Sequence, residues 1–138
     1  MRRGERAVAA ARSLVGTPFR AHGRDPAHGL DCVGLAELAA RAEGFAGDVP
    51  NGYALRRGDA AGVRALIEAA GLVRARGARA GDLLLLASGA GQLHLAIDSG
   101  GGIIHADAML RRVVDRPGAP PWPVLGRWRV IGRRFSKR

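Results

Sequence analysis

The hydrophobic pattern of this chain changes from a helical period to a strand period about halfway along, and this change narrows the fold to one class. Apolar side chains three or four residues apart predict helices over residues 5–15 and 33–44. A third helix is predicted over residues 60–70, with Asp59 as its N-cap and Gly71 as its C-terminal stop. The first half of the chain is therefore expected to be helical.

The second half of the chain predicts an antiparallel sheet. Residues 83–86 form a short apolar run between turn residues, which is typical of a buried strand. Residues 94–98 alternate with period two, and a tight turn at 99–102 joins them to a second strand at 103–106. Two shorter strands and a loop complete the predicted elements: 112–114, 128–131 and 117–123. Helices followed by an antiparallel sheet, with no internal repeat or linker, predict one α+β domain over residues 1–138.

Length and composition agree with a soluble globular domain. A chain of 138 residues with 47% apolar and 25% charged residues suits a single hydrophobic core. The longest apolar run, 83–87, is far shorter than the roughly 20 residues that span a bilayer. Arg12 and Ser13 interrupt the apolar stretch at 7–16, which makes it a poor signal-peptide core. We therefore expect synthesis in the cytoplasm without a signal peptide, and no membrane insertion.

The net charge of +10 needs an explanation, and all basic residues except Lys137 are arginine. Nucleic acid, an anionic cell envelope or an acidic neighbouring subunit could each be the partner, because net charge affects association rather than fold. The sequence has no helix-turn-helix with a credible recognition helix and no zinc-finger spacing, so specific nucleic-acid binding is not expected. Much of the charge is expected to be a solvated arginine-rich surface.

The single cysteine, Cys32, lies where a loop rich in glycine and proline, 19–30, gives way to the helix over 33–44. One cysteine excludes an intrachain disulfide and a cysteine-rich zinc cluster. A thiol at the first turn of a helix is close to the positive end of the helix dipole, which favours the thiolate. Cys32 is thus a candidate nucleophile with a lowered pKa; the alternative is a small buried apolar residue.

Two histidines of the predicted hairpin are candidate partners for this thiol. If the hairpin turns between Asp98 and Ile103, His94 lies opposite position 107 and His105 opposite position 96. The two imidazoles are then within diagonal reach on one face of the sheet. Each histidine alone could be an ordinary sheet residue, but together with Cys32 they predict a Cys-His-His site in which a base activates the thiol and a third group orients the base.

Other polar and aromatic residues are expected to have lesser roles. His22 and His28 lie in the 19–30 loop and are predicted to be solvated or at the rim of the site. Trp122 and Trp128 are predicted to pack in the core or in a loop rather than to form carbohydrate platforms. The histidine and cysteine spacings do not match a zinc motif, so no metal is expected.

Five short motifs resemble those of the NlpC-type cysteine peptidases of bacterial cell walls, a papain-like family. They are Gly-Thr-Pro-Phe-Arg (16–20), Gly-Leu-Asp-Cys-Val-Gly-Leu (29–35), Gly-Asp-Leu (81–83), His-Leu-Ala-Ile (94–97) and Ile-His-Ala (104–106). Their order and spacing match the family between residue 11 and about residue 107. The resemblance implies a papain-like fold with Cys32 as the nucleophile, His94 as the base, His105 as the orienting group and no cofactor.

The resemblance also points to a substrate side formed by Asp31, Phe19 and His22. Phe19 stands where the family commonly has a tyrosine whose hydroxyl is implied to help stabilise the oxyanion, so this donor is missing or replaced by His22 or Gln92. The backbone amide of Cys32 is still available as an oxyanion donor.

A second departure bears on which bond is cut. Val33 replaces a serine that, together with the preceding aspartate, helps some family members bind a free peptide amino terminus. Asp31 is retained, where it is predicted to serve as an N-cap, to contact substrate, or both. An endopeptidase cut in an intact or crosslinked stem peptide is therefore as well supported as recognition of a free terminus.

The short Cys-Val-Gly-Leu motif and the arginine-rich tail are most similar to peptidases encoded in tail clusters of phages and gene transfer agents. This resemblance implies a stem-peptide hydrolase at the tail tip of a phage or phage-like particle, in contact with other tail-tip or baseplate proteins and acting on the target cell wall. Two alternatives stay open: a structural tail-tip subunit with the same fold and little or no activity, favoured by the missing tyrosine, and a basic nucleic-acid-binding module.

Overall fold

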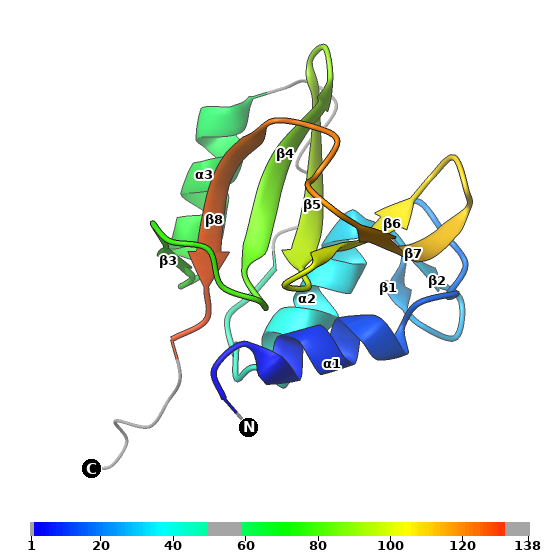
Figure 1. The fold of residues 1–138 in the computed structure, drawn as a ribbon, viewed down its shortest axis with the longest axis horizontal. Helices are drawn as coiled ribbons and strands as arrows, with labels where there is room; N and C mark the ends of the chain where they lie inside the picture. Colours follow the sequence, from blue (N-terminus) through cyan, green and yellow to red (C-terminus); the bar gives the residue numbers. More distant parts are fainter. Residues whose placement is uncertain (1, 50–58, 132–138) are drawn as a thin grey trace.

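Three helices and eight strands make up the part of the chain that the structure, a computed structural model, describes: residues 2–49 and 59–131 (Figure 1). The helices are α1 (Glu5–Ser13), α2 (Cys32–Ala42) and α3 (Ala60–Ala69). The strands are β1 (Arg24–Asp25), β2 (Gly29–Leu30), β3 (Val73–Arg74), β4 (Leu83–Gly89), β5 (Gln92–Asp98), β6 (Gly102–Asp107), β7 (Arg112–Pro117) and β8 (Val124–Arg129).

Six of these strands form one antiparallel sheet in the order β3-β8-β4-β5-β6-β7, and β1 pairs with β2 in a separate small hairpin. In Figure 1, α1 and α2 lie together at one end of this sheet and α3 lies beside β8 and β4. The predicted α+β fold, with helices first and the sheet afterwards, is confirmed.

The register of the β5–β6 hairpin matches the one predicted from its turn. Ile97 pairs with Ile104 and Asp98 pairs with Ile103. The 99–102 segment closes the hairpin with a hydrogen bond from the Ser99 N–H to the Gly102 carbonyl at 2.9 Å. This register fixes which side chains of the two strands share a face.

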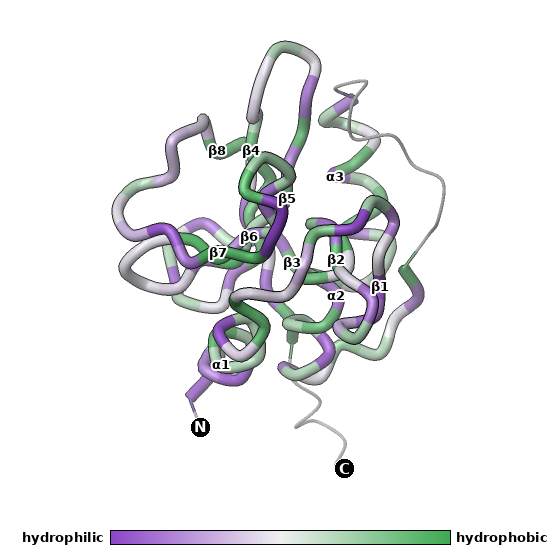
Figure 2. Tube along the Cα trace, turned by 90° about the vertical axis from the view of Figure 1, so that its right-hand side faces the viewer, coloured by the Kyte–Doolittle hydropathy of each residue, from purple (hydrophilic) through white to green (hydrophobic). Residues whose placement is uncertain are grey.

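Alternation along the strands gives the sheet two apolar faces. Leu83, Leu85, Leu95 and Ile97 belong to the large core shared with α2, while a smaller cluster with Trp122 lies on the other face. The smaller cluster consists of Leu84, Leu86, Ala96 and Ile103. In Figure 2, which is coloured by hydropathy, hydrophilic residues lie at the amino-terminal end of α1.

The caps of α3 form as the sequence predicts. The Asp59 side chain accepts a hydrogen bond from the Gly62 N–H at 2.9 Å. Gly71 follows the last helical turn with φ of 110°, a left-handed conformation that glycine adopts without steric cost. The predicted loop around Pro50, Asn51 and Gly52 lies outside the described residues.

Two predictions about strands are wrong in their extent. The strand predicted over 128–131 begins at Val124 and ends at Arg129, because it pairs with Leu83–Leu86 of β4 through an irregular register. The strand predicted over 112–114 continues to Pro117, the first residue of the predicted loop 117–123, because it pairs with β6 as far as Gly102. Gly126 breaks its apolar alternation, and a side chain there would collide with the ring of Trp128. The short strands β1, β2 and β3 were not predicted, because two residues carry no detectable period.

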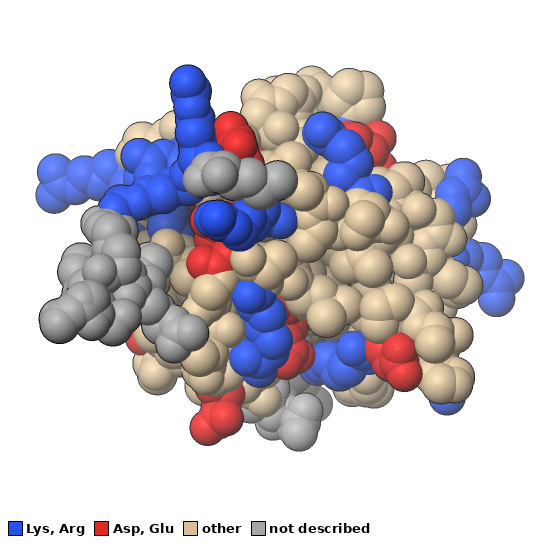
Figure 3. Space-filling model, turned by 90° about the horizontal axis from the view of Figure 1, so that it is seen from below, with Lys and Arg blue, Asp and Glu red and all other residues tan. Residues whose placement is uncertain are grey.

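Part of the positive charge is neutralised inside the fold. Asp82 is only 1% exposed and pairs with Arg127 at 2.5 Å and Arg129 at 2.6 Å, and Arg127 also pairs with Asp98 at 3.1 Å. We call these four residues the Asp82 cluster. Elsewhere basic and acidic side chains are interspersed over the surface seen from below (Figure 3). No helix among the described residues is long and apolar enough to cross a membrane.

Candidate active site

Cys32 is the first residue of α2, and Asp31 caps this helix. The Asp31 Oδ1 accepts a hydrogen bond from the Gly34 N–H at 2.8 Å. Its Oδ2 accepts one from the His22 N–H at 3.0 Å, which ties the preceding loop to the start of the helix. At Gly34 a Cβ would lie 2.2 Å from the carbonyl oxygen of Gly23, so only glycine permits this close approach.

The carboxylate of Asp31 is also neutralised by an arginine that sequence reasoning missed. Arg24, on β1, places its Nη1 2.8 Å from Asp31 Oδ1. Both oxygens of Asp31 therefore have partners within the protein. The N-cap role predicted for Asp31 is confirmed, and its contact with substrate stays a prediction.

The thiol of Cys32 is buried, with 7% of the residue exposed. Burial raises the pKa of Cys32 to about 12, which outweighs the lowering effect of a hydrogen bond from the backbone of Leu95 and of the nearby Arg24 charge. The lowered pKa expected from the helix terminus is thus wrong for this state of the protein. The free energy lost when a thiolate is removed from water exceeds the stabilisation that the helix terminus and one nearby cation provide.

His94 and His105 form a hydrogen-bonded pair, as the hairpin register predicts. His94 Nε2 lies 2.9 Å from His105 Nδ1, and His105 is only 2% exposed. Burial, helped by the neighbouring His105, lowers the pKa of His94 to about 4; burial also lowers the pKa of His105, although Asp107 opposes both effects. Both imidazoles are therefore neutral at pH 7.

The third aromatic ring at this pair is Trp122, from the segment that joins β7 to β8. Its ring centroid lies 5.5 Å from that of His94 and 5.6 Å from that of His105, both in edge-to-face geometry. Trp122 was predicted to pack in the core or in a loop, and it packs on the smaller apolar cluster of the sheet. Its contact with both imidazoles was not predicted.

The structure brings Cys32 close to the strand that carries His94. The Cys32 thiol meets the backbone of Leu95, the residue after His94. The helix that begins at Cys32 packs against both β5 and β6. Cys32 thus lies beside the residue that follows His94 on β5. Its side chain packs in the large core, whereas Trp122, which contacts both imidazoles, packs on the smaller cluster of the opposite face.

The residues predicted for the substrate side lie in the chain segment before Cys32. Phe19 is half-buried against the core, its N–H donates to the Arg111 carbonyl at 2.9 Å, and it has no hydroxyl to offer. His22 is exposed and adopts φ of 62°, which its hydrogen bond to Asp31 supports. His28 has a 72% exposed side chain and pairs with Asp25, so it is solvated as expected.

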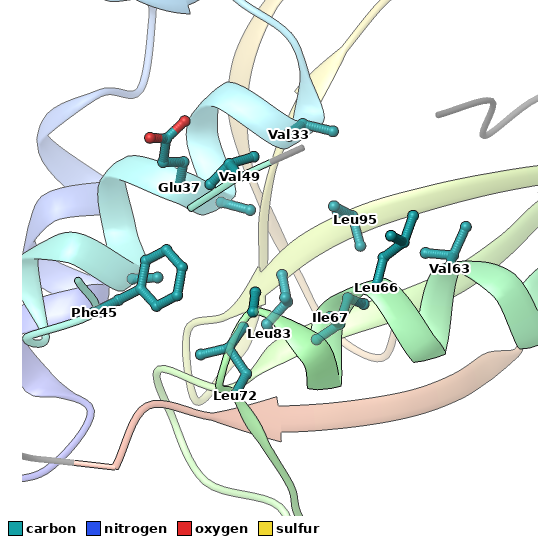
Figure 4. A pocket seen from close by; sticks show the side chains of 13 residues that line it. Val33, Glu37, Phe45, Val49, Val63, Leu66, Ile67, Leu72, Leu83 and Leu95 are labelled. Carbon is teal, nitrogen blue, oxygen red and sulfur yellow. The ribbon is translucent and has the colours of Figure 1, made fainter. Parts of the chain in front are cut away.

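An apolar cavity of about 80 Å³ lies between α2, α3 and the sheet (Figure 4). Val33 and Leu95, the sequence neighbours of Cys32 and His94, line one part of it, and Phe45 lies at another. Glu37 is the only charged residue in the lining described. Among the described residues, no three His, Cys, Asp or Glu side chains are grouped closely enough to hold a metal ion.

Comparison with known proteins shows the family of this chain. No protein-family model and no curated protein matches the sequence. Among solved structures, the NlpC/p60 domain of the peptidoglycan hydrolase SagA is 32% identical, with a TM-score of 0.59 over 83% of this chain and 88% of that one. At this identity and coverage, the chain belongs to the NlpC/p60 family.

Two further structures agree in fold. RipB, a peptidoglycan hydrolase from Mycobacterium tuberculosis, is 24% identical with a TM-score of 0.61, over 94% of this chain and 65% of that one. An NLP/P60-family protein similar to a lipoprotein, from Staphylococcus aureus, is 20% identical with a TM-score of 0.56, over 94% of this chain and 41% of that one. The papain-like α+β fold that the motifs imply is confirmed.

Proposed function

We propose that this protein is a cysteine peptidase that hydrolyses the stem peptides of peptidoglycan. The observation that carries the proposal is the hydrogen-bonded pair His94–His105, of which His94 lies on β5, the strand whose backbone meets the thiol of Cys32. Family membership supports it, because the SagA domain at 32% identity is named a peptidoglycan hydrolase. In this proposal Cys32 is the nucleophile, His94 the base and His105 the group that orients His94.

The pKa values set the form of the first step. With the pKa of Cys32 raised to about 12 and that of His94 lowered to about 4, the resting pair is a neutral thiol and a neutral imidazole. In the proposed mechanism His94 is the tautomer that carries its proton on Nε2 and donates it to His105 Nδ1, so that Nδ1 of His94 takes the thiol proton as sulfur attacks the amide carbonyl. The backbone N–H of Cys32, at the start of α2, stabilises the oxyanion.

The second step returns this proton. The His94 imidazolium protonates the leaving amine, and the C–N bond breaks to give a thioester on Cys32. Water then attacks the thioester while His94 again acts as the base, and the carboxylic acid product leaves with the thiol restored. Every proton and bond is accounted for without a metal or cofactor.

The substrate side of this site would be formed by Asp31, Phe19 and His22. Because Arg24 and two backbone N–H groups occupy the Asp31 carboxylate, this carboxylate is poorly placed to bind a free ammonium. This favours an endopeptidase that cuts within a stem peptide. Substitution of Arg24 should then free this carboxylate and raise activity on peptides with a free amino terminus relative to internal peptides.

The finer proposal places this activity at the tail tip of a phage or phage-like particle. It rests on the similarity of the Cys-Val-Gly-Leu motif and the arginine-rich tail to tail-associated peptidases. The protein would be made in the bacterial cytoplasm, join other tail-tip or baseplate proteins, and act in the wall of the target cell. Mass spectrometry of purified particles tests this role: the protein should copurify with tail proteins, and its absence from intact particles would contradict it.

A second candidate is a structural tail-tip subunit that keeps the fold and lacks useful activity. The buried thiol, with its pKa raised to about 12, and the missing hydroxyl at Phe19 favour this candidate. Alkylation of Cys32 at pH 7 separates the two. A peptidase should react faster than its His94→Ala variant, whereas a structural subunit should react equally slowly in both.

Digestion of isolated peptidoglycan tests the proposed activity itself. Wild-type protein should release stem-peptide fragments that mass spectrometry identifies, and Cys32→Ala and His94→Ala should not. His28→Ala is the matched control, because the His28 side chain is 72% exposed and pairs with Asp25, and it should retain activity. Equal release by wild type and Cys32→Ala would exclude the thiol mechanism.

A further inference from the structure

Trp122 lies over the one hydrogen bond on which the proposed site depends. Its ring contacts both His94 and His105 edge-to-face, at centroid distances of 5.5 and 5.6 Å, while the two imidazoles are themselves joined at 2.9 Å. The three rings therefore form one closed group. His105 is 2% exposed and His94 is partly buried, so the Trp122 ring shields one side of this hydrogen bond from water.

Neighbouring prolines and a hydrogen bond to β4 restrict the segment that carries Trp122. Pro120, Pro121 and Pro123 flank the tryptophan, and their fixed φ angles limit the conformations of this connection. The Pro123 carbonyl accepts a hydrogen bond from the Ala87 N–H of β4 at 3.0 Å. The indole thus rests on the sheet through a stiff connection, and it packs on the apolar cluster that includes Ala96 and Ile103.

We propose that Trp122 is a positioning residue that keeps the His94–His105 hydrogen bond dry and keeps His94 in its neutral, proton-accepting form. This inference rests on the proposed function, since it assigns Trp122 a role in that site. Trp122 acts through the imidazoles and not on the substrate. A role as a carbohydrate platform is the competing role for an aromatic ring at such a site.

The charges around the pair are consistent with this role. Asp107 on β6 favours the protonated form of His94, whereas His105 opposes it, and Arg116 on β7 opposes protonation of His105. Cys32, on the α2 side, is uncharged because its pKa is raised. With one carboxylate favouring the charged imidazole, exclusion of water is the main factor that keeps His94 neutral, and burial is the largest cause of its lowered pKa.

Histidine titration by NMR tests the proposal without any need for activity, so it remains informative if the proposed function fails. Trp122→Ala admits water and should raise the pKa of His94 by about one unit or more, because the charged form is then hydrated. Trp122→Phe keeps an apolar ring over the pair and should restore most of the wild-type value. Signals of the exposed His22 and His28 provide internal references, and Val73→Ala, at the opposite edge of the sheet, is the matched control.

Kinetic measurements separate a positioning role of Trp122 from a role as a carbohydrate platform. A positioning residue predicts that Trp122→Ala lowers kcat by about tenfold with little change in KM and moves the acid limb of the rate profile to higher pH. If Trp122→Ala does not fold, Trp122→Leu, which keeps an apolar contact of smaller area, takes its place. An unchanged His94 titration, or a loss confined to KM, would overturn the proposal.

Discussion

Strand β5 carries a polar cluster near each end, and the two clusters are built on opposite electrostatic principles. Near its start, His94 pairs with His105, and both imidazoles are uncharged at neutral pH. At its end, Asp98 joins the Asp82 cluster, in which two carboxylates face two guanidinium groups. Every buried side-chain nitrogen and oxygen among the described residues has a hydrogen-bond partner, so neither cluster is left unsatisfied.

The Asp82 cluster keeps fixed charges near neutral pH, whereas the His94–His105 pair can gain and lose a proton. In the Asp82 cluster each charge is compensated, and hydrogen bonds to two carboxylates raise the pKa of Arg127, so no proton moves there near neutral pH. In the histidine pair, burial is the largest cause of the lowered pKa of each imidazole. A proton gained there is costly and is readily passed on, as general base catalysis requires. We therefore expect substitutions at the two ends to affect different properties.

The largest effect is expected at the thiol. Cys32→Ser should lower peptidoglycan-hydrolase activity by a factor on the order of 10³ or more, because the less acidic hydroxyl is a much weaker nucleophile with the same base. The free energy of unfolding should change little, since the two side chains are similar in size. Hydrolysis rates and urea denaturation measure the two properties. Activity of Cys32→Ser comparable to that of the wild type would show that Cys32 is not the nucleophile.

The opposite result is expected at the Asp82 cluster. Asp82→Asn leaves Arg129 without its carboxylate and should lower the free energy of unfolding by about 3 kcal/mol, the usual cost of breaking a buried ion pair. Activity per folded molecule should stay unchanged. Asp25→Asn is the matched control, because the Asp25 pair with His28 is exposed and should contribute little. Loss of activity in a still-folded Asp82→Asn would show that the two ends of β5 are coupled.

The pH dependence of stability should also distinguish the two ends. Because the pKa of His94 is lowered from 6.5 to about 4 in the folded protein, the unfolded state binds the extra proton between these values. The free energy of unfolding should therefore decrease by up to about 3 kcal/mol as the pH falls from 6.5 to 4. At the other extreme, the raised pKa of Cys32 predicts a loss of stability as the pH rises above 9.0 towards 12.

Denaturation curves across this pH range provide the measurement. His94→Gln should flatten the acid part of the profile and Cys32→Ala the alkaline part. An acid decrease of the same size in His94→Gln would show that other groups, and not the histidine pair, cause it.

The smallest effect is expected at the cap of α2. Asp31→Ala removes the hydrogen bond to the Gly34 N–H and should lower the free energy of unfolding by about 1 kcal/mol. Asp31→Asn keeps a cap oxygen while it removes the charge paired with Arg24, so it should retain most of this stability. Thermal unfolding of both variants measures the difference. Equal losses would show that the ion pair, and not the cap, stabilises this end of the helix.

The parts of the fold that the sequence predicts well depend on local pattern. The helices have a clear apolar period, and the caps at Asp31 and Asp59 use side chains that hydrogen-bond three residues ahead. The β5–β6 register follows from one tight turn, which is why the approach of His94 to His105 could be predicted from the sequence. The thiol position at the start of α2 was likewise predictable from the change of pattern at residue 32.

The features that sequence reasoning missed depend on contacts between distant segments. Arg24 meets Asp31 across a hairpin of two-residue strands, and Trp122 reaches His94 and His105 from another connection. The pKa of Cys32 was predicted in the wrong direction, because the helix terminus is visible in a sequence and the depth of burial is not. The Arg24–Asp31 pair, the Trp122 contacts and the burial of Cys32 all depend on tertiary packing, which the local hydrophobic pattern does not show.

Capture of the covalent intermediate is the most direct test of the central claim, that Cys32 attacks a stem-peptide amide with His94 as its base. Wild-type protein mixed with isolated stem peptides and quenched in acid should carry an acyl group, which intact-protein and fragment mass spectrometry should place on Cys32. His94→Ala should show no such adduct, and His28→Ala should show it at the wild-type level. Hydrolysis of the peptides without an adduct on Cys32, and at an unchanged rate in Cys32→Ala, would contradict the account.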